Sequence, residues 1–204
     1  MKERPIIMTT DSIRGILDGR KTMTRRVIKP QPELCGNFYE LDKAGWSSGI
    51  TSITPVYGHS LYYACPYGVP GDRLWVREAF KIEEENRVRY LADIDQPAYE
   101  RGWRSSIFMP RWASRITLEV VNVRVERLQE ISEEGAIAEG ISPISPGYNG
   151  VMWSAKIADE TLCSRDPIDL YSLVWDTLNA KRGYSWSSNP WVWVIEFKKA
   201  VSDG

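Results

Sequence analysis

The most constraining feature of this 204-residue chain is a strand pattern in residues 115–128 whose apolar alternation changes phase halfway along. The alternating apolar residues are Ile116, Leu118 and Val120 on one phase, then Val121, Val123 and Val125 on the other. Because successive side chains of a strand point to opposite faces, this slip predicts a β-bulge or sharp bend at Val120-Val121. Such a bend is typical of a strand that wraps around a small barrel.

The other predicted elements mix helices and strands without strict alternation. Caps at Thr10, Asp11 and Ser12 and a stop at Gly19 predict a short helix, Ser132 and Gly140 bound a second one, and Asp166-Pro167 opens a third. Short apolar runs predict strands at 74–76, 88–91 and 191–197, whereas 30–72 and 141–164 have the composition of irregular excursions. This order favours a mixed α+β barrel over a doubly wound sheet.

Length and composition predict one domain spanning residues 1–204 and exclude several classes of function. With 26 Lys and Arg against 27 Asp and Glu, the net charge of -1 gives no overall field for a long polyanion, which favours a small substrate. No segment has the roughly 20 apolar residues needed to span a bilayer, and three scattered cysteines fit a reducing cytoplasm. Because His59 is the only histidine, a metal site with two histidine ligands is excluded. The sequence contains no glycine-rich phosphate loop, so it does not indicate a nucleotide cofactor.

Four segments in the same order resemble the ASCH domain family. They are the GRKTMTRR stretch at 19–26, Gly71-Asp72-Arg73-Leu74, the 116–125 strand leading into 128–140, and the closing Val194-Ile195-Glu196-Phe197-Lys198. The resemblance implies a PUA-like β-barrel with flanking helices and long loop insertions at about 29–70, 79–112 and 141–188. These insertions make the chain similar to the larger members of the family carried by phages and prophages.

The resemblance also implies an active site. The small bacterial N(4)-acetylcytidine amidohydrolases of this family have a Lys, a Thr and a Glu that correspond to Lys21, Thr24 and Glu139, although Glu133 and Glu134 lie one helical turn from Glu139. Removing an acyl group from a base nitrogen requires a nucleophile, a base and an acid, roles that Thr24, Lys21 and Glu139 could take in that order.

The spacing of Lys21 and Thr24 gives a geometric condition for this chemistry. In a flat strand the two side chains would face opposite sides, whereas in a tight helical turn or an irregular loop they can converge. The enzyme hypothesis therefore requires a turn at residues 21–24. A basic role for Lys21 also requires a lowered pKa, through burial or through the nearby charges of Arg20, Arg25 and Arg26. The alternative is structural: Arg20 and Lys21 complement a helix C-terminus and Thr24 starts a strand.

Further candidates for substrate binding are Arg20, Arg26, Trp75, Glu78, Arg111 and Trp112. Arg26 could bind a base edge, a phosphate or a buried carboxylate, whereas Glu78 could pair with Arg77. The basic and aromatic mixture around Arg111 and Trp112 is typical of surfaces that stack nucleic acid, but Trp112 could equally anchor a loop to the core.

Three functions remain open at this level. The first is a metal-independent and cofactor-independent amidohydrolase acting on a modified pyrimidine nucleoside. The second is a non-catalytic reader that binds single-stranded RNA or a flipped modified base. The third is a metal-dependent ribonuclease, for which the carboxylates of Glu78, Asp93 and Glu139 are the available ligands.

Overall fold

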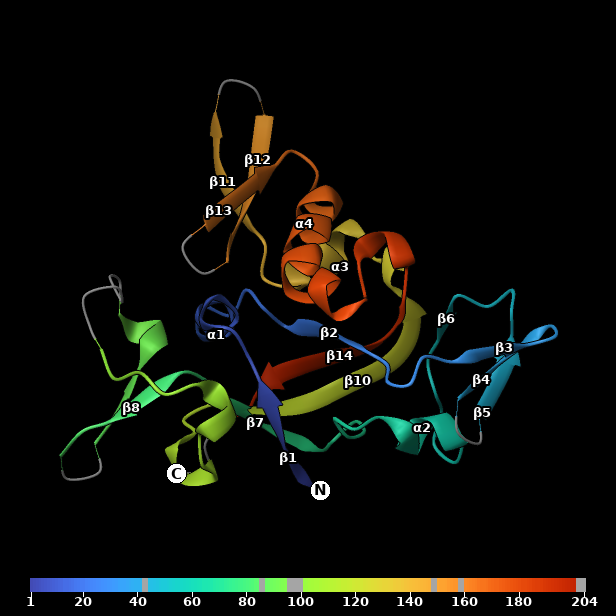
Figure 1. Cartoon of the computed structure of the whole chain (residues 1–204), viewed down its shortest axis with the longest axis horizontal. Coiled ribbons are helices and arrows are strands. Elements are labelled where there is room, and N and C mark those ends of the chain that lie inside the picture. The colour runs from blue at the N-terminus through green and yellow to red at the C-terminus, as the bar shows by residue number, and fades with distance from the viewer. Residues whose placement is uncertain (42–43, 85–86, 95–100, 148–149, 158–159, 201–204) are drawn as a thin grey trace.

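The computed structural model describes residues 1–41, 44–84, 87–94, 101–147, 150–157 and 160–200. Its centre is one six-stranded sheet that combines the first and last strands of the chain (Figure 1). In order across the sheet these strands are β1 (Glu3–Ile7), β7 (Arg73–Arg77), β10 (Thr117–Arg127), β14 (Trp191–Lys199) and β2 (Met23–Val27), with β6 (Ser52–Ile53) paired to β10. Only β1 and β7 pair in parallel among these strands.

The predicted irregularity in the longest strand is confirmed. The register of β10 against β14 shifts between Val120 and Asn122, which leaves Val121 as the extra residue of a bulge. Val121 is 50% exposed, whereas Val120 and Val123 on either side are buried. The bulge also separates two pairings at the other edge of β10, since β7 lies along its first part and β6 along its last. The phase change therefore keeps Leu118, Val120, Val123 and Val125 in one core cluster, while the bulged Val121 points away from it.

Strand β14 is the centre of the core because both of its faces are buried. One face carries Trp191, Trp193, Ile195 and Phe197 into a cluster shared with helix α1 (Thr10–Leu17), and the other carries Val192 and Val194 against helices α3 (Glu133–Ala138) and α4 (Pro167–Asn179). The predicted strand at 191–197 is thus confirmed. Its two apolar faces place α1 on one side of the sheet and α3 and α4 on the other.

Local capping explains where the helices begin and end. The predicted caps of α3 and α4 are confirmed: Ser132 Oγ accepts from Gly135 N at 3.1 Å, and Asp166 Oδ1 accepts from Ile168 N at 2.7 Å. Helix α1 is capped one residue earlier than predicted, by Thr9, whose hydroxyl accepts from Ser12 N at 3.2 Å. The chain leaves α1 through Gly19, whose positive φ of 75° suits the end of a helix.

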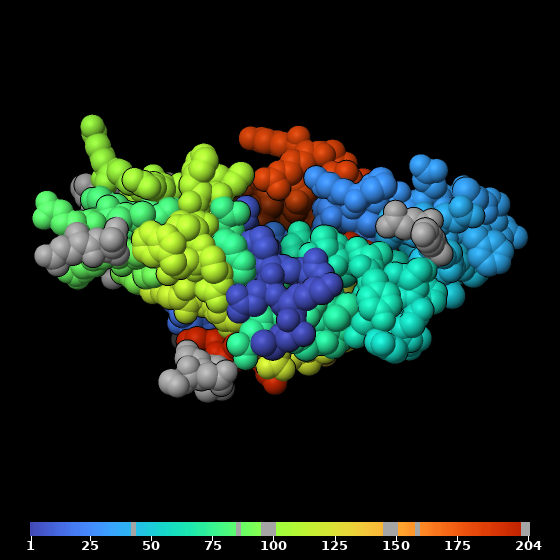
Figure 2. Space-filling model, turned by 90° about the horizontal axis from the view of Figure 1, so that it is seen from below, coloured from blue at the N-terminus to red at the C-terminus, as the bar shows by residue number. Residues whose placement is uncertain are grey.

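Besides α1, α3 and α4, the described segments between the strands of the central sheet form three small sheets and one short α-helix. Their elements are β3 (Glu33–Cys35), β4 (Phe38–Leu41), β5 (Ala44–Ser47) and helix α2 (Ser60–Ala64), then β8 (Phe80–Ile82) and β9 (Val88–Tyr90), and finally β11 (Ser142–Gly147), β12 (Gly150–Ile157) and β13 (Glu160–Ser164). Figure 2 shows the first two groups extending to opposite sides of the N-terminal residues.

The prediction of an irregular excursion at 141–164 is wrong. This segment forms the three-stranded antiparallel sheet β11-β12-β13, with Trp153, Ala155 and Leu162 packed against the core cluster of α3 and α4. Apolar residues occupy both phases of β12, because Val151 and Met152 precede Trp153. The two-residue period that identifies a half-buried strand is therefore hidden in the sequence.

The fold is a mixed α+β arrangement of several sheets and flanking helices. The path of the central sheet ends at β1 and β2, and no pairing between described residues joins these two strands into a closed barrel. Within the described part of the chain, no helix combines the length and apolar character needed to cross a bilayer.

The bulge in β10 can be tested with two matched substitutions. Val121→Thr should change the free energy of unfolding by less than about 0.5 kcal/mol, since its side chain is half exposed. Val123→Thr should cost about 1–3 kcal/mol, because it places a hydroxyl in the core. Urea denaturation of both variants measures the difference, and equal losses would contradict the bulged register.

Candidate functional site: a buried charge network at the edge of the sheet

The candidate site forms where β2, the last strand of the central sheet, meets the end of helix α3. Arg25 N at the outer edge of β2 donates to Glu139 Oε1 at 2.6 Å, and just before the strand Thr22 N donates to Ala138 O at 2.9 Å. Glu139 is the C-cap residue of α3. The end of this helix therefore satisfies backbone donors that an edge strand would otherwise expose.

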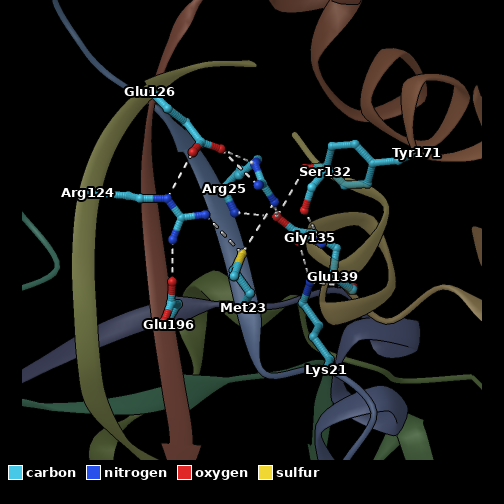
Figure 3. A network of polar contacts seen from close by, with 10 residues as sticks. All are labelled: Lys21, Met23, Arg25, Arg124, Glu126, Ser132, Gly135, Glu139, Tyr171 and Glu196. Carbon is cyan, nitrogen blue, oxygen red and sulfur yellow. Dashed lines mark hydrogen bonds and ion pairs between the residues drawn. The ribbon is translucent and has the colours of Figure 1, made fainter. Parts of the chain in front are cut away.

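Lys21 and Glu139 form a buried ion pair at this junction (Figure 3). Lys21 Nζ lies 2.6 Å from Glu139 Oε2 and 2.7 Å from the main-chain oxygen of the same residue. Both side chains are about 5% exposed, at 5% and 6%. Two of the three ammonium protons of Lys21 are thus directed at Glu139, and no described residue accepts the third.

Two glycines make room for Lys21. A Cβ atom added to Gly15 would lie 3.2 Å from the Lys21 Cβ, and one added to Gly140 would lie 3.3 Å from it. Gly140 also has a φ of 103°, which side chains of L-residues rarely adopt. The close approach of the two helix ends to Lys21 therefore depends on residues without side chains.

A second buried ion pair, between Arg25 and Glu126, adjoins the first. The Arg25 guanidinium, which is fully buried, donates through Nε to Glu126 Oε1 at 2.9 Å and lies 3.4 Å from Glu139 Oε1 through Nη1. Tyr171 on α4 donates its hydroxyl to the same Glu139 oxygen at 3.1 Å. Arg124 continues the network outward, since it donates to Glu126 Oε2 at 2.9 Å. Figure 3 shows this chain of contacts running from β10 across β2 to α3.

The network shifts the pKa values of both members of the central pair. Burial lowers the pKa of Lys21, and the charges of Arg26 and Arg25 lower it further, against the opposing effect of Glu139. Burial raises the pKa of the Glu139 carboxyl, but the charges of Lys21 and Arg25 outweigh this effect and bring it below its usual value. Glu139 is therefore a carboxylate at neutral pH, and Lys21 loses its proton more readily than an ordinary lysine.

A cavity of about 1620 Å³ opens beside this network. Lys21, Thr24 and Glu139 all line it, together with Tyr171 from α4 and residues of α1 and β12. Thr24 is buried on the face of β2 that packs with Trp193 and Ile195, and its hydroxyl makes no hydrogen bond with the described residues. The structure thus brings all three predicted catalytic residues to one cavity and leaves the threonine hydroxyl available.

The predicted turn at residues 21–24 does not form. Residues 20–22 are irregular and β2 begins at Met23, so Lys21 lies before the strand and Thr24 within it. Side chains alternate between the two faces only within the strand, so the direction of Lys21, which precedes the strand, is not fixed by this alternation. Lys21 and Thr24 can therefore line the same cavity. Both parts of the structural alternative are found. Lys21 and Arg20 bind carbonyls at a helix C-terminus, at Glu139 and at Gly140, although this is the end of α3, and Thr24 is the second residue of strand β2.

The predicted binding residues divide into two groups. Arg20 and Arg26 line the cavity, where Arg20 donates to Ser142 Oγ at 2.6 Å and Arg26 donates to Ile7 O at 2.7 Å. The others lie outside its lining: Trp75, Glu78, Arg111 and Trp112.

The second group takes part in contacts on another part of the surface. Arg111 pairs with Glu3 at 3.0 Å and lies near the Trp75 ring, while Trp112 is 60% exposed and anchors no core. Glu78 is buried and binds Arg115 instead of Arg77, with two contacts of 3.0 Å.

The carboxylates named for a metal-dependent ribonuclease are not brought together. Glu78 and Asp93 are bridged by Arg115, whose contacts with Asp93 are 2.8 Å, whereas Glu139 belongs to the network at β2. Among the described residues no group of three or more His, Cys, Asp or Glu side chains is placed to hold a metal ion. The geometry therefore gives no support to a metal site at these three residues.

Sequence reasoning missed Glu126 and Tyr171 and gave Arg25 only the role of a nearby charge. Glu126 follows Val125 in β10 and faces the Arg25 guanidinium across the sheet, which no local pattern indicates. The one available signal was a charged residue within an otherwise apolar strand, since buried charges are paired. Tyr171 lies on the apolar stripe of α4, where its hydroxyl could not be assigned a partner from the sequence.

Comparisons with known proteins neither add to nor correct this assignment. No family model matches the chain, and neither a curated protein nor a solved structure matches it significantly. Membership of the ASCH family therefore stays a prediction from the four motifs.

The network can be tested by removing one charge from it. Glu139→Gln should lower the free energy of unfolding by about 3–5 kcal/mol, because it leaves Lys21 buried without a carboxylate and Arg25 with Glu126 alone. Glu196→Gln is the matched control: this carboxylate is partly exposed, and its loss should cost less than about 1 kcal/mol. Equal effects in chemical denaturation would contradict the network.

The same pair predicts a pH dependence of stability. Because the pKa of Glu139 is lowered in the folded state, its contribution is complete above the ordinary glutamate pKa of about 4.3 and is lost as pH falls through the lowered value. The stability gap between the wild type and Glu139→Gln should therefore be constant near neutral pH and narrow below about pH 4. A gap that widens in acid would reverse the assigned direction of the pKa shift.

Proposed function

We propose that the protein is a hydrolase that removes the acyl group from the exocyclic nitrogen of a modified cytosine nucleoside such as N(4)-acetylcytidine. The observation that carries this proposal is a cavity lined by a buried lysine of lowered pKa and a buried threonine hydroxyl without a described partner. A nucleophilic hydroxyl and a base that shares its site are the groups that acyl transfer requires. The resemblance to the ASCH amidohydrolases supports the same residues.

In this mechanism Lys21 acts first as a base, which takes a proton from Thr24, and then as an acid, which gives it to the leaving nitrogen. Neutral Lys21 takes the proton of Thr24, and the alkoxide attacks the acyl carbon to form a tetrahedral intermediate. As the carbon–nitrogen bond breaks, the Lys21 ammonium returns the proton to the leaving nitrogen, which gives cytidine and an acylated Thr24. Lys21 then takes a proton from water, and the resulting hydroxide attacks the ester carbon. As the bond to Thr24 Oγ1 breaks, Lys21 returns this proton to the leaving oxygen, which releases the acid and restores the hydroxyl and the neutral amine.

The electrostatics support a positioning role for Glu139 rather than the acid role expected from the sequence. A carboxyl whose pKa is lowered has no proton to donate at neutral pH. Its carboxylate instead holds Lys21 Nζ from one side, while Arg25 and Tyr171 hold the carboxylate from the other. Arg25 also gives Glu139 a second cation, so Glu139 retains a counter-ion when Lys21 becomes neutral.

The proposal includes the family and its PUA-like barrel. It is supported by the order of the elements, in which α1 leads into the GRKTMTRR segment, a bulged strand leads into α3, and the closing strand pairs with β2. It is also supported by the position of the family's three residues on one cavity. A strand pairing that closed the sheet between β1 and β2 would complete the barrel.

The first test is release of cytidine from N(4)-acetylcytidine, followed by chromatography. Thr24→Ala and Lys21→Ala should each lower turnover by about 10³-fold or more, because each removes a group that takes part in bond formation. Thr24→Ser should keep activity, since it keeps the hydroxyl. Thr22→Ala is the control, because Thr22 is exposed and contributes only backbone hydrogen bonds to the described structure. Unchanged turnover in Thr24→Ala would exclude this threonine as the nucleophile.

The role of Lys21 predicts the shape of the pH–rate profile. Because the neutral amine is the active form, kcat/KM should rise with pH and level off below the ordinary lysine pKa of about 10.4. Lys21→Arg should be inactive over the whole range, since a guanidinium does not act as a base. A flat profile would contradict a lysine base, and binding of the nucleoside without turnover would indicate a reader.

A further inference from the structure

The cavity carries an excess of positive charge that the proposed chemistry does not use. Its described lining residues include eight Lys or Arg side chains, against only two acidic ones, Asp11 and Glu139. The whole chain, in contrast, has a net charge of -1. The positive charge is therefore concentrated at the cavity, and clefts lined by one sign of charge attract ligands of the opposite sign.

Half of these cations are neutralised by carboxylates. The neutralised pairs are Lys21 with Glu139, Arg25 with Glu126 and Glu139, Arg20 with Asp18, and Arg14 with Asp11. The other four cations have no carboxylate partner among the described residues: Arg26, Lys29, Lys156 and Arg182. These four give the cavity an unbalanced positive charge.

Two of these cations, Lys29 and Arg182, are linked to one lining aromatic residue, Tyr184, the first by contact and the second by its place in the chain. Lys29 Nζ is 5.0 Å from the centre of the Tyr184 ring, and Arg182 precedes Tyr184 by two residues across Gly183, which has a φ of 86°. All three line the cavity, and both cations are exposed. Arg182 supplies a planar donor fork and Lys29 a point charge, the two donor types that bind phosphate oxygens.

The distance between Lys29 and Thr24 is limited by the short segment of chain that joins them. Lys29 follows Thr24 by five residues and lies in the bend just after β2, so the Cα atoms of the two residues are at most about 18 Å apart. A nucleotide and the Lys29 side chain can bridge this distance together. A substrate with its base at Lys21 and Thr24 would thus place an attached phosphate toward Lys29 and Arg182.

We propose that the cavity takes a substrate that carries a phosphate, so that the protein acts on an acylated cytidine nucleotide in preference to the free nucleoside. Lys29 and Arg182 bind the phosphate, and Tyr184 holds Lys29 in place. This inference rests on the proposed deacylation for the base end of the substrate. The phosphate contact itself is independent of that chemistry.

The kinetic test compares N(4)-acetylcytidine with its 5′-monophosphate. The wild type should have a kcat/KM at least about 10-fold higher for the nucleotide, and the preference should fall as salt is added. The double variant Lys29→Ala/Arg182→Ala should lose this preference through KM and keep the wild-type kcat/KM for the nucleoside. Lys181→Ala is the matched control, because Lys181 is an exposed neighbour outside the cavity lining.

Calorimetric titration with cytidine 5′-monophosphate separates this inference from the hydrolase proposal. If neither substrate is cleaved but the nucleotide binds and the double variant abolishes binding, the deacylation fails and the phosphate site stands. If both substrates are cleaved equally in the wild type and the variant, the phosphate site is wrong and the deacylation stands. Absence of nucleotide binding in the wild type would also overturn the inference.

A third substrate identifies the kind of phosphate. A trinucleotide with a central N(4)-acetylcytidine presents phosphodiesters instead of a monoester. Faster cleavage of the trinucleotide than of the monophosphate would place the natural substrate in RNA, and the reverse would make it a mononucleotide. Either order supports the phosphate contact if it is lost in the double variant.

Discussion

The buried ion pair between Lys21 and Glu139 is the interaction on which the rest of this structure depends. It joins the end of α3 to the segment before β2, and the same carboxylate accepts the backbone N–H of Arg25 at the free edge of the central sheet. Removing two charges from water costs several kcal/mol for each ion, so the pair is favourable only with further hydrogen bonds around it. Tyr171 and Arg25 supply those bonds, and in doing so they connect the stability of the sheet edge to the geometry of the cavity.

The same arrangement produces the chemistry that we propose. A lysine buried beside one carboxylate would keep its proton, but Glu139 is also held by Arg25, which is in turn held by Glu126. The carboxylate therefore stays charged and fixed whether or not Lys21 is protonated. Thr24 lines the same cavity from the face of β2 opposite to Arg25, and its hydroxyl makes no hydrogen bond with the described residues. The charges of Lys21, Glu139 and Arg25 thus stabilise the fold and also determine the proposed reactivity.

The sequence predicted the features that depend on neighbouring residues and missed those that depend on distant ones. The β10 bulge and the caps Ser132 and Asp166 were visible because their signals are local and have a defined spacing. The contact of Arg25 with Glu126 joins residues about 100 positions apart, and no periodicity indicates it. The residues Lys21, Thr24 and Glu139 came from a resemblance, and the structure adds the charge state of Glu139. The sheet β11-β12-β13 was missed because its apolar residues occupy both strand phases.

The pKa of Lys21 is the quantity that tests this account most directly. It can be measured by NMR, following the Nζ and Cε resonances of the lysines as pH is raised, with the Lys21 signal assigned by its loss in Lys21→Arg. We expect Lys21 to titrate at a lower pH than the exposed lysines of the same chain, because burial lowers its pKa. A Lys21 that titrates together with them would contradict the buried, charge-compensated base on which the proposed mechanism depends.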